Sequence, residues 1–179
     1  MEKKYKLTDE TIGFEGKTLY RIEALKDFGE IKKGDKGGFI ESENNLAHEG
    51  DAWVSDDAWV YDNARVYGNA HVYGSACVYG DARVSDYARV YDKSNVFDNA
   101  RVYDHTLVYD NAWVSGNAYV RGNARVYDSA HLCGNACVYG NAEVYGHACV
   151  YGDARVSGNA LVHGDACVCG NAKISNKSD

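Results

Sequence analysis

The stretch "VYGNAEVYGHACVYGDARVSGNA", Val138–Ala160, repeats one six-residue unit four times. Every sixth residue is valine, and an alanine follows each valine four places later. The spacing holds without an insertion for 21 consecutive hexads between Ala52 and Ile174. All but two hexads keep the valine, and all but two keep the alanine. A period this strict makes the repeat, rather than any single motif, the feature that decides the fold.

The repeating unit, written from its valine, is V–[YS]–[GD]–[ND]–A–x. Side chains alternate in an extended chain, so Ala and Val face one side while x and [YS] face the other. Gly and Asn tolerate the positive φ of a sharp turn, which predicts a corner after each short strand. Such a strand is too short to be stable alone, but stacked turns bury a continuous column and pair their backbones. The pattern therefore predicts a β-helix, and its regular corners disfavour the alternative of a flat antiparallel sheet.

Composition and charge limit the classes of function. The chain has 15 Tyr, 19 Gly, no Pro and a formal net charge of −7. An acidic chain lacks the basic surface that phosphate backbones require, so we do not expect a nucleic-acid partner. The N-terminal "MEKKYKLTDE" has no apolar core, and no stretch approaches the ~18 apolar residues of a membrane span. We therefore expect a cytoplasmic protein with no membrane partner and with its six cysteines reduced.

The repeat resembles the hexapeptide repeat of left-handed parallel β-helix proteins, the trimeric LpxA-like superfamily. In that family a small residue follows an aliphatic one four places later, with Asn or Asp just before it, and three hexads form one triangular coil. The resemblance implies an all-β fold: a single-stranded, left-handed parallel β-helix of about seven triangular coils over residues 51–175. With strands about 4.8 Å apart, the prism would be roughly 30 Å long.

The segment before the repeat resembles a narrower group. "LKDFGEIKKGDKGGFIESENNLAHEGDAWV", Leu25–Val54, is similar to the segment that precedes the repeat in YdcK-like proteins, which are named as hexapeptide transferases, and in short repeat proteins of Firmicutes genomes and prophages. We expect residues 1–50 to form a small N-terminal β cap and residues 176–179 a C-terminal tail. Counting the period back places Leu46 in an alanine position and His48 in a valine position, so regular coils should start after His48. The glycines of "KKGDKGGFIE" are expected to form a structural turn rather than a phosphate loop.

One outward column of the expected coils consists of tyrosines. With three hexads per coil, the [YS] position of one face holds Tyr73, Tyr91, Tyr109, Tyr127 and Tyr145. Aromatic rings about 4.8 Å apart can stack. Two interpretations stay open. The column is either a ladder that stabilises its own sheet, or a flat contact surface for another protein or a second copy, since Tyr is favoured in interface cores.

A second face is expected to be basic. Its outward positions hold Arg65, Arg83, Arg101, Arg121 and Arg155. Arginine beside tyrosine is also typical of nucleic-acid surfaces. Aspartates occupy the adjacent corners, at Asp62, Asp81, Asp98 and Asp153. We therefore expect a solvated face whose charges are locally paired.

A third face gathers the residue types that bind zinc. His131, Cys149 and Cys167 fall in one column on consecutive coils, and imidazole and thiolate are suitable zinc ligands. Side chains on a flat ladder point the same way, however, whereas a tetrahedral site needs convergent ligands. We expect no metal there. Cys149 and Cys167 would lie within disulfide range, but we expect no native disulfide.

The sequence leaves open whether the chain is an enzyme, and it favours a non-catalytic protein. The resemblance implies an acyltransferase with a catalytic histidine in a groove between subunits, often under a loop that interrupts the coils, and a C-terminal helix. The hexads have no such loop, and "SNKSD" directly follows the last one. His105 and His147, which replace a corner Asn, are the candidate catalytic residues. Neither has an obvious carboxylate in the sequence that would orient its imidazole ring.

The sequence thus favours a non-catalytic binding or scaffold protein of phage or bacterial origin, with a protein partner and no cofactor. Self-association is expected through a flat face or at the open edge of the last coil, because exposed strand edges pair readily. Two alternatives stay open. One is a hexapeptide-repeat acyltransferase, and the other is an acidic decoy that mimics the charge of nucleic acid with its corner aspartates and inhibits a host factor.

Overall fold

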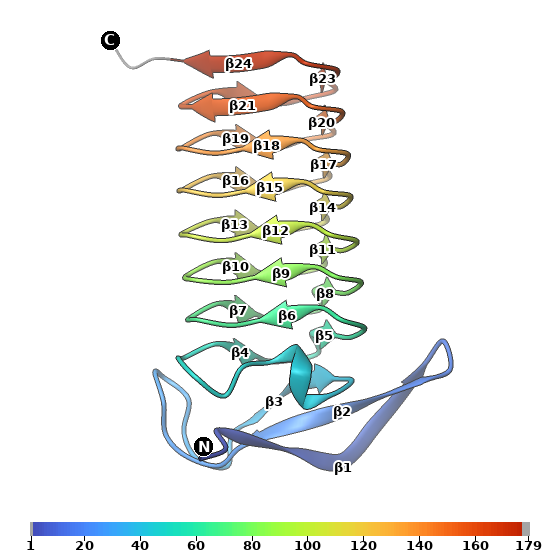
Figure 1. Ribbon diagram of the computed structural model, residues 1–179, viewed down its shortest axis with the longest axis vertical. Coiled ribbons are helices and arrows are strands. Elements are labelled where there is room, and N and C mark those ends of the chain that lie inside the picture. The colour runs from blue at the N-terminus through green and yellow to red at the C-terminus, as the bar shows by residue number, and fades with distance from the viewer. Residues whose placement is uncertain (1, 177–179) are drawn as a thin grey trace.

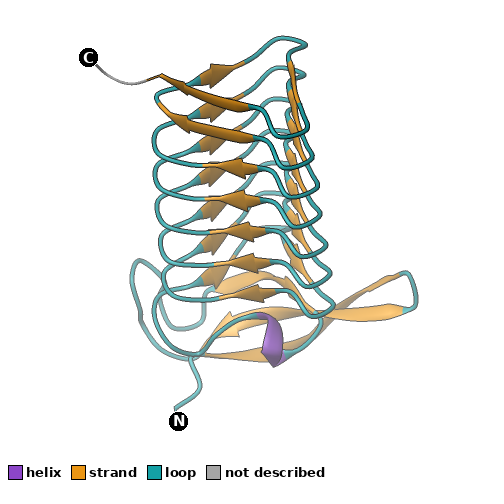
Figure 2. Ribbon diagram, turned by 45° about the horizontal axis from the view of Figure 1, so that its top comes forward, coloured by secondary structure: helices purple, strands orange, loops and turns teal. Residues whose placement is uncertain are grey.

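The computed structural model describes residues 2–176 and shows a stack of short parallel strands (Figure 1). The chain is an all-β parallel β-solenoid of about eight turns. Each turn passes through three sheets that are joined by tight corners (Figure 2). Across residues 2–176, no helix has the length and apolar character needed to cross a bilayer.

The three sheets give the solenoid three outward faces, which we name after their side chains. The cysteine face consists of β5 (Trp59–Val60), β8 (Cys77–Val78), β11 (Asn95–Val96), β14 (Trp113–Val114), β17 (His131–Leu132), β20 (Cys149–Val150) and β23 (Cys167–Val168). The tyrosine face consists of β4 (Trp53–Val54), β7 (His71–Val72), β10 (Arg89–Val90), β13 (Leu107–Val108), β16 (Arg125–Val126), β19 (Glu143–Val144) and β22 (Leu161–Val162), each with the residue after it. The arginine face consists of β6 (Arg65–Val66), β9 (Arg83–Val84), β12 (Arg101–Val102), β15 (Tyr119–Val120), β18 (Cys137–Val138), β21 (Arg155–Gly158) and β24 (Lys173–Asn176).

The register repeats along the stack, because each strand pairs with the strand three places later. His71 lies opposite Arg89 and Val72 opposite Val90, so partners are 18 residues apart. Most valines therefore pack against a valine of the neighbouring turn, and Leu132 takes that place between Val114 and Val150. Val72 and Val90 are fully buried, and Val168 near the C-terminal end is still only 4% exposed. The core is a narrow column of small side chains, as the alternating pattern predicts.

The corners use aspartate as well as glycine for their left-handed residue. The third residue of the unit has a positive φ, for example 55° at Asp56 and 61° at Asp104. The expectation that Asn takes this conformation was wrong, since no Asn within the described range has a positive φ. The Asp carboxylate accepts a hydrogen bond from the next turn, at 3.0 Å from the Gly74 N–H to Asp56 and 2.8 Å from the Gly122 N–H to Asp104. Aspartate therefore combines tolerance of this backbone conformation with a link between turns.

The stack begins earlier than the six-residue period indicates. Phe39 pairs with Trp59, and Leu46 forms a bridge with Val66. Both pairs are 20 residues apart rather than 18, because two extra residues lie between Leu46 and Trp53. Leu46 is fully buried and takes a valine position. The expected alanine position for Leu46 was therefore wrong, since counting back through an insertion shifts the phase.

The first strands lie at the N-terminal end of the stack (Figure 1). β1 (Tyr5–Phe14) and β2 (Lys17–Ala24) form an antiparallel hairpin, and β2 pairs with β3 (Lys36–Ile40), which pairs with β5. A single 3₁₀ turn, η1 (Glu43–Asn45), follows. The ammonium of Lys4, 1% exposed, donates to the carbonyls of Gly50 at 3.2 Å and Ala52 at 2.7 Å.

The glycines Gly37 and Gly38 lie within β3 rather than in a turn. A Cβ at Gly37 would lie 2.5 Å from the Ile22 side chain and 2.5 Å from the Val54 carbonyl oxygen. A Cβ at Gly38 would lie 2.6 Å from the Ala58 carbonyl oxygen. The strand therefore needs glycine because it packs directly on the backbone of the first turns. The structural turn expected for this stretch is confined to the residues before β3.

Candidate binding surfaces

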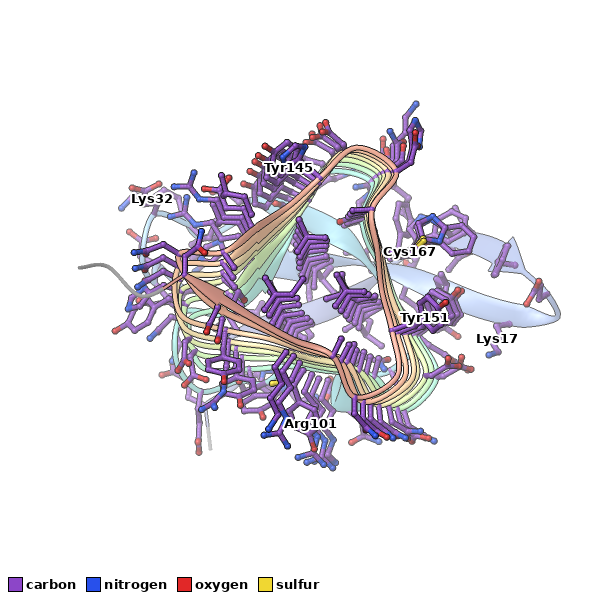
Figure 3. The ribbon with its side chains drawn as sticks, turned by 90° about the horizontal axis from the view of Figure 1, so that it is seen from above. Lys17, Lys32, Arg101, Tyr145, Tyr151 and Cys167 are labelled. Carbon is purple, nitrogen blue, oxygen red and sulfur yellow. The ribbon has the colours of Figure 1, made fainter. Side chains whose placement is uncertain are left out.

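The outward side chains stand in columns, as the view along the axis shows (Figure 3). Tyr145, Arg101 and Cys167 point outward on three different sides, while small side chains fill the interior. Residues 18 apart are direct Cα partners on neighbouring strands. Residues that share a column in the sequence are therefore spatial neighbours, and each face can be examined as a surface of its own.

The tyrosine face carries a continuous aromatic ladder. Successive ring centroids are 4.8 or 4.9 Å apart, and successive ring planes differ by 1° to 5°. The members are Tyr73, Tyr91, Tyr109, Tyr127 and Tyr145. His163 extends the ladder beyond Tyr145, with a centroid distance of 5.3 Å. The rings hold one another in a flat strip, because each is fixed between neighbours.

The column beside the ladder mixes charged and apolar side chains. Glu143 accepts a hydrogen bond from the Tyr127 hydroxyl at 3.0 Å and lies 3.6 Å from the Arg125 guanidinium. Leu161 is 55% exposed near the C-terminal end of the same column.

Within the ladder itself, Tyr91 lies between two other rings, and this burial raises its pKa to about 12. The Tyr91 phenol is therefore neutral at physiological pH and can donate a hydrogen bond to a partner.

A hollow of about 440 Å³ opens at the N-terminal end of the ladder. Asp51, His71, Tyr73 and Arg89 are among the residues that line it. Burial and the nearby Arg89 charge lower the pKa of His71. The sequence pattern did not bring Asp51 and His71 together, because they are 20 residues apart and the columns join residues that are 18 apart.

The arginine face presents exposed guanidinium groups in register. Arg83 lies directly opposite both Arg65 and Arg101. The expected pairing with corner aspartates is not found, since none of the arginines at positions 65, 83, 101, 121 and 155 forms an ion pair within residues 2–176. Corner carboxylates such as Asp98 accept backbone N–H groups instead. Two of the arginines lie over aromatic rings, Arg101 at 5.4 Å from Tyr119 and Arg121 at 4.9 Å from Tyr139.

The cysteine face brings the zinc-type residues into register without converging them. His131 lies opposite Cys149, and Cys149 lies opposite Cys167. The described residues contain no group of three side chains placed to hold a metal ion. His131 instead stacks on Trp113 with a centroid distance of 5.2 Å. All six cysteines are free thiols, and burial raises the pKa of the Cys149 thiol.

The cysteine face also carries a second aromatic ladder, which the sequence analysis missed. Tyr61, Tyr79 and Phe97 stack at 5.0 Å with planes within 3°. Phe14 of β1 packs against Tyr61 at 5.8 Å. The 18-residue column that identifies the tyrosine face identifies this ladder too, but the cysteines and histidine of the same face indicate a metal site instead.

The two candidate catalytic histidines occupy exposed corners. His105 stacks on Tyr87, with ring centroids 4.9 Å apart. Neither the His105 side chain nor the His147 side chain forms a hydrogen bond with a carboxylate in the part of the chain that the structure describes. The geometry therefore provides no orienting group of the kind that a catalytic histidine uses.

Comparison with known families agrees with this architecture. The model of the YdcK β-solenoid repeat matches residues 58–74, 64–78, 148–164 and 154–170. No curated protein sequence matches the chain. The fold and its in-register columns define a β-solenoid repeat protein. Two stretches of its repeats, near the two ends of the regular stack, are similar to the YdcK β-solenoid repeat.

Proposed function

We propose that this protein is a non-catalytic binding or scaffold module that contacts a protein partner through its tyrosine face. The observation that carries the proposal is the ladder of five stacked rings, 4.8 to 4.9 Å apart. Tyrosine supplies a large contact area at a low cost in conformational entropy, and stacking reduces that cost further. The partner is therefore expected to have a flat surface that covers several rungs.

The charges beside the ladder indicate the chemistry of that partner. Arg89 and Arg125 flank the rings on one side, and Glu143 already interacts with Arg125 and Tyr127. Leu107 lies between the two arginines in the same column. The proposed partner thus presents apolar groups to the rings and carboxylates at the rim. Acidic groups at a rim contribute to the rate and specificity of association more than to affinity.

The finer description of the fold is part of the same proposal: a left-handed solenoid with three hexads per turn, closed by an N-terminal β cap. In Figure 3, seen from the C-terminal end, the chain passes clockwise from the cysteine face to the arginine face and then to the tyrosine face. A clockwise path that advances toward the viewer is left-handed. Support for the cap comes from Tyr5, whose buried hydroxyl donates to the Leu46 carbonyl at 2.7 Å.

Three further parts of the proposal rest on the sequence: a phage or bacterial origin, a cytoplasmic location and an active state without a cofactor. The acyltransferase alternative would use His105 or His147, whose side chains have no carboxylate partner among residues 2–176. The decoy alternative would use the corner aspartates. Several of these, such as Asp56 and Asp104, accept backbone N–H groups, which leaves fewer of their oxygens free to contact a host factor. Both observations favour the binding module.

The experiment compares two matched pairs of substitutions. Tyr109→Ala with Tyr127→Ala removes two adjacent rungs, whereas Tyr103→Ala with Tyr139→Ala changes the same repeat position on the arginine face. Partners captured from a lysate of the source organism are identified, purified and titrated against each variant. The ladder pair should weaken binding by roughly 30-fold or more, as expected for interface tyrosines, while the control pair binds normally. Absence of any partner, or equal loss in both pairs, would contradict the proposal.

Self-association is the second partner relation that we propose, through the tyrosine face or through β24. β24 lies at the edge of its sheet, and Ile174 within it is 36% exposed. Sedimentation equilibrium of the wild type and of Ile174→Lys separates the two routes. A dimer that persists in Ile174→Lys but dissociates in the ladder pair uses the tyrosine face. A monomer at all concentrations would exclude both routes.

A further inference from the structure

A hollow of about 670 Å³ lies where the N-terminal segment meets the arginine face. One wall is the segment from Glu43 to Glu49, which begins with η1 and lies beside the first turns (Figure 2). The other wall consists of Arg65, Tyr67 and Arg83. A second hollow of about 250 Å³ adjoins the first, because Tyr67 and Arg83 line both. Clefts of a few hundred Å³ at the junction of two units are where small ligands commonly bind.

The two arginines of this hollow have no partner among residues 2–176 that offsets their charge. Arg65 and Arg83 are direct register partners, and both side chains are exposed. Like charges directly opposite each other on neighbouring strands are destabilising. Neither guanidinium forms an ion pair or lies over an aromatic ring within residues 2–176, in contrast to Arg101, which lies over Tyr119. An anion between Arg65 and Arg83 would replace their repulsion with two attractive contacts.

The carboxylates near the hollow are mostly engaged elsewhere. Glu43 lies 2.6 Å from the Lys3 ammonium and 3.7 Å from His48 Nε2. Asp86 accepts a hydrogen bond from the Ser85 hydroxyl at 2.9 Å. Glu49 is the exception, because it is exposed on the wall opposite the arginines. Its charge opposes anion binding, and this gives the proposal an additional test.

The wall opposite the arginines is held in place by buried contacts. Tyr5 stacks on His48 with ring centroids 4.4 Å apart. Asn45 is fully buried, and its amide donates to the carbonyls of Asp62 at 3.0 Å and Ala64 at 2.9 Å. These contacts fix the wall to the first turns of the solenoid. A preformed cleft binds its ligand with a smaller ordering cost than a mobile one.

We propose that this hollow binds a small organic oxyanion, a phosphate or carboxylate carried on an apolar or aromatic body. The planar guanidinium groups of Arg65 and Arg83 donate to the oxyanion, and each can offer the two parallel N–H groups that such anions accept. The Tyr67 ring, 40% exposed, contacts the apolar part. This site lies on a different face from the tyrosine ladder, so it is independent of the proposed protein partner.

The experiment titrates the full-length protein with phenyl phosphate, benzoate and inorganic phosphate, using NMR or calorimetry. Phenyl phosphate or benzoate should bind with one-to-one stoichiometry and more tightly than inorganic phosphate, because only the first two have a ring for Tyr67. The difference between phenyl phosphate and benzoate shows which oxyanion the site prefers. Arg83→Gln should weaken binding by about tenfold or more, the usual effect of losing a charge-assisted hydrogen bond.

Two further variants serve as control and counter-test. Arg155 occupies the same repeat position of the same face, far from the hollow, so Arg155→Gln should leave the affinity unchanged. Glu49→Gln should strengthen binding several-fold, because it removes the opposing charge. The proposal is overturned if none of the probes binds at roughly 10 mM, or if Arg155→Gln weakens binding as much as Arg83→Gln. It is also overturned if single-stranded RNA binds more tightly than the three probes and if Arg83→Gln and Arg155→Gln weaken this binding equally. The face would then be an extended surface for polyanions.

Discussion

The regular solenoid and the N-terminal segment differ in how their stabilising contacts are distributed. In the solenoid each buried contact has copies in the turns above and below, as Val108 has between Val90 and Val126. In the N-terminal segment each contact is made once, as by the Lys4 ammonium on the carbonyl of Ala52. Stability in a stacked repeat is a sum of similar nearest-neighbour terms. In the N-terminal segment, stability depends on a few contacts that no other residue duplicates.

The largest expected effect is in the N-terminal segment. Gly38→Ala should destabilise the protein by about 3 kcal/mol or more, because the new Cβ would lie 2.6 Å from the Ala58 carbonyl oxygen, where the backbone has to move. Chemical denaturation followed by circular dichroism measures the change. Gly13→Ala in β1 is the matched control, since a Cβ there has no atom within 4 Å. Equal stability of the two variants would show that β3 is not tightly packed on the first turns.

A moderate effect is expected for a core position of the solenoid. Val108→Ala removes two buried methyl groups and should cost about 2 kcal/mol. Val144→Ala, two turns away, should cost a similar amount, and the double variant should equal the sum within about 0.5 kcal/mol. The same denaturation measurements test this additivity. A large coupling between the two sites would mean that the turns are not equivalent units.

A smaller effect concerns pH. Burial lowers the pKa of Lys4 from 10.5 to about 8 in the folded protein, so above pH 8 the unfolded chain binds more protons at this residue than the folded one. Stability should therefore rise between about pH 8 and 10, by roughly 1 kcal/mol per pH unit at most from this single proton. Lys4→Met should abolish that rise. An identical pH slope in the variant would show that Lys4 does not titrate with folding.

The smallest expected effect is at a corner of the solenoid. Asp104→Gly preserves the left-handed conformation but removes the acceptor of the Gly122 N–H, and it should cost about 1 kcal/mol or less. Asp81→Ala changes an exposed corner residue whose φ is not positive, and it should leave stability unchanged. If both variants lost equal stability, corner charge rather than the hydrogen bond between turns would be the cause.

The interior of the solenoid could be predicted from sequence because one physical rule, the alternation of side chains, applies in every hexad. The tyrosine ladder follows from the same rule with an 18-residue column. The second ladder, with Tyr79 at its centre, obeys the rule as well. It was not predicted, because the cysteines and histidine of that face indicate metal ligands rather than an aromatic column.

Other features depend on competition between neighbours, which spacing alone does not reveal. A corner carboxylate can interact with an arginine side chain or with a backbone N–H of the next turn. In the structure the N–H is held at hydrogen-bond distance, for example 3.0 Å from Gly116 to Asp98, whereas an arginine must lose side-chain freedom to reach the same oxygen. The hollow beside Arg65 was also beyond prediction, because its other wall belongs to a segment that does not repeat.

Because hexads stack in register, the number of 18-residue blocks sets the length of the molecule. Each block of 18 residues adds one rung to every column and about 4.8 Å to the rod, while the faces keep their angular positions. Removing one such block from the middle of the stack would shorten the tyrosine strip by a single ring and leave both ends unchanged. Insertion or loss of whole blocks can therefore adjust how far apart two bound objects are held without redesigning either contact.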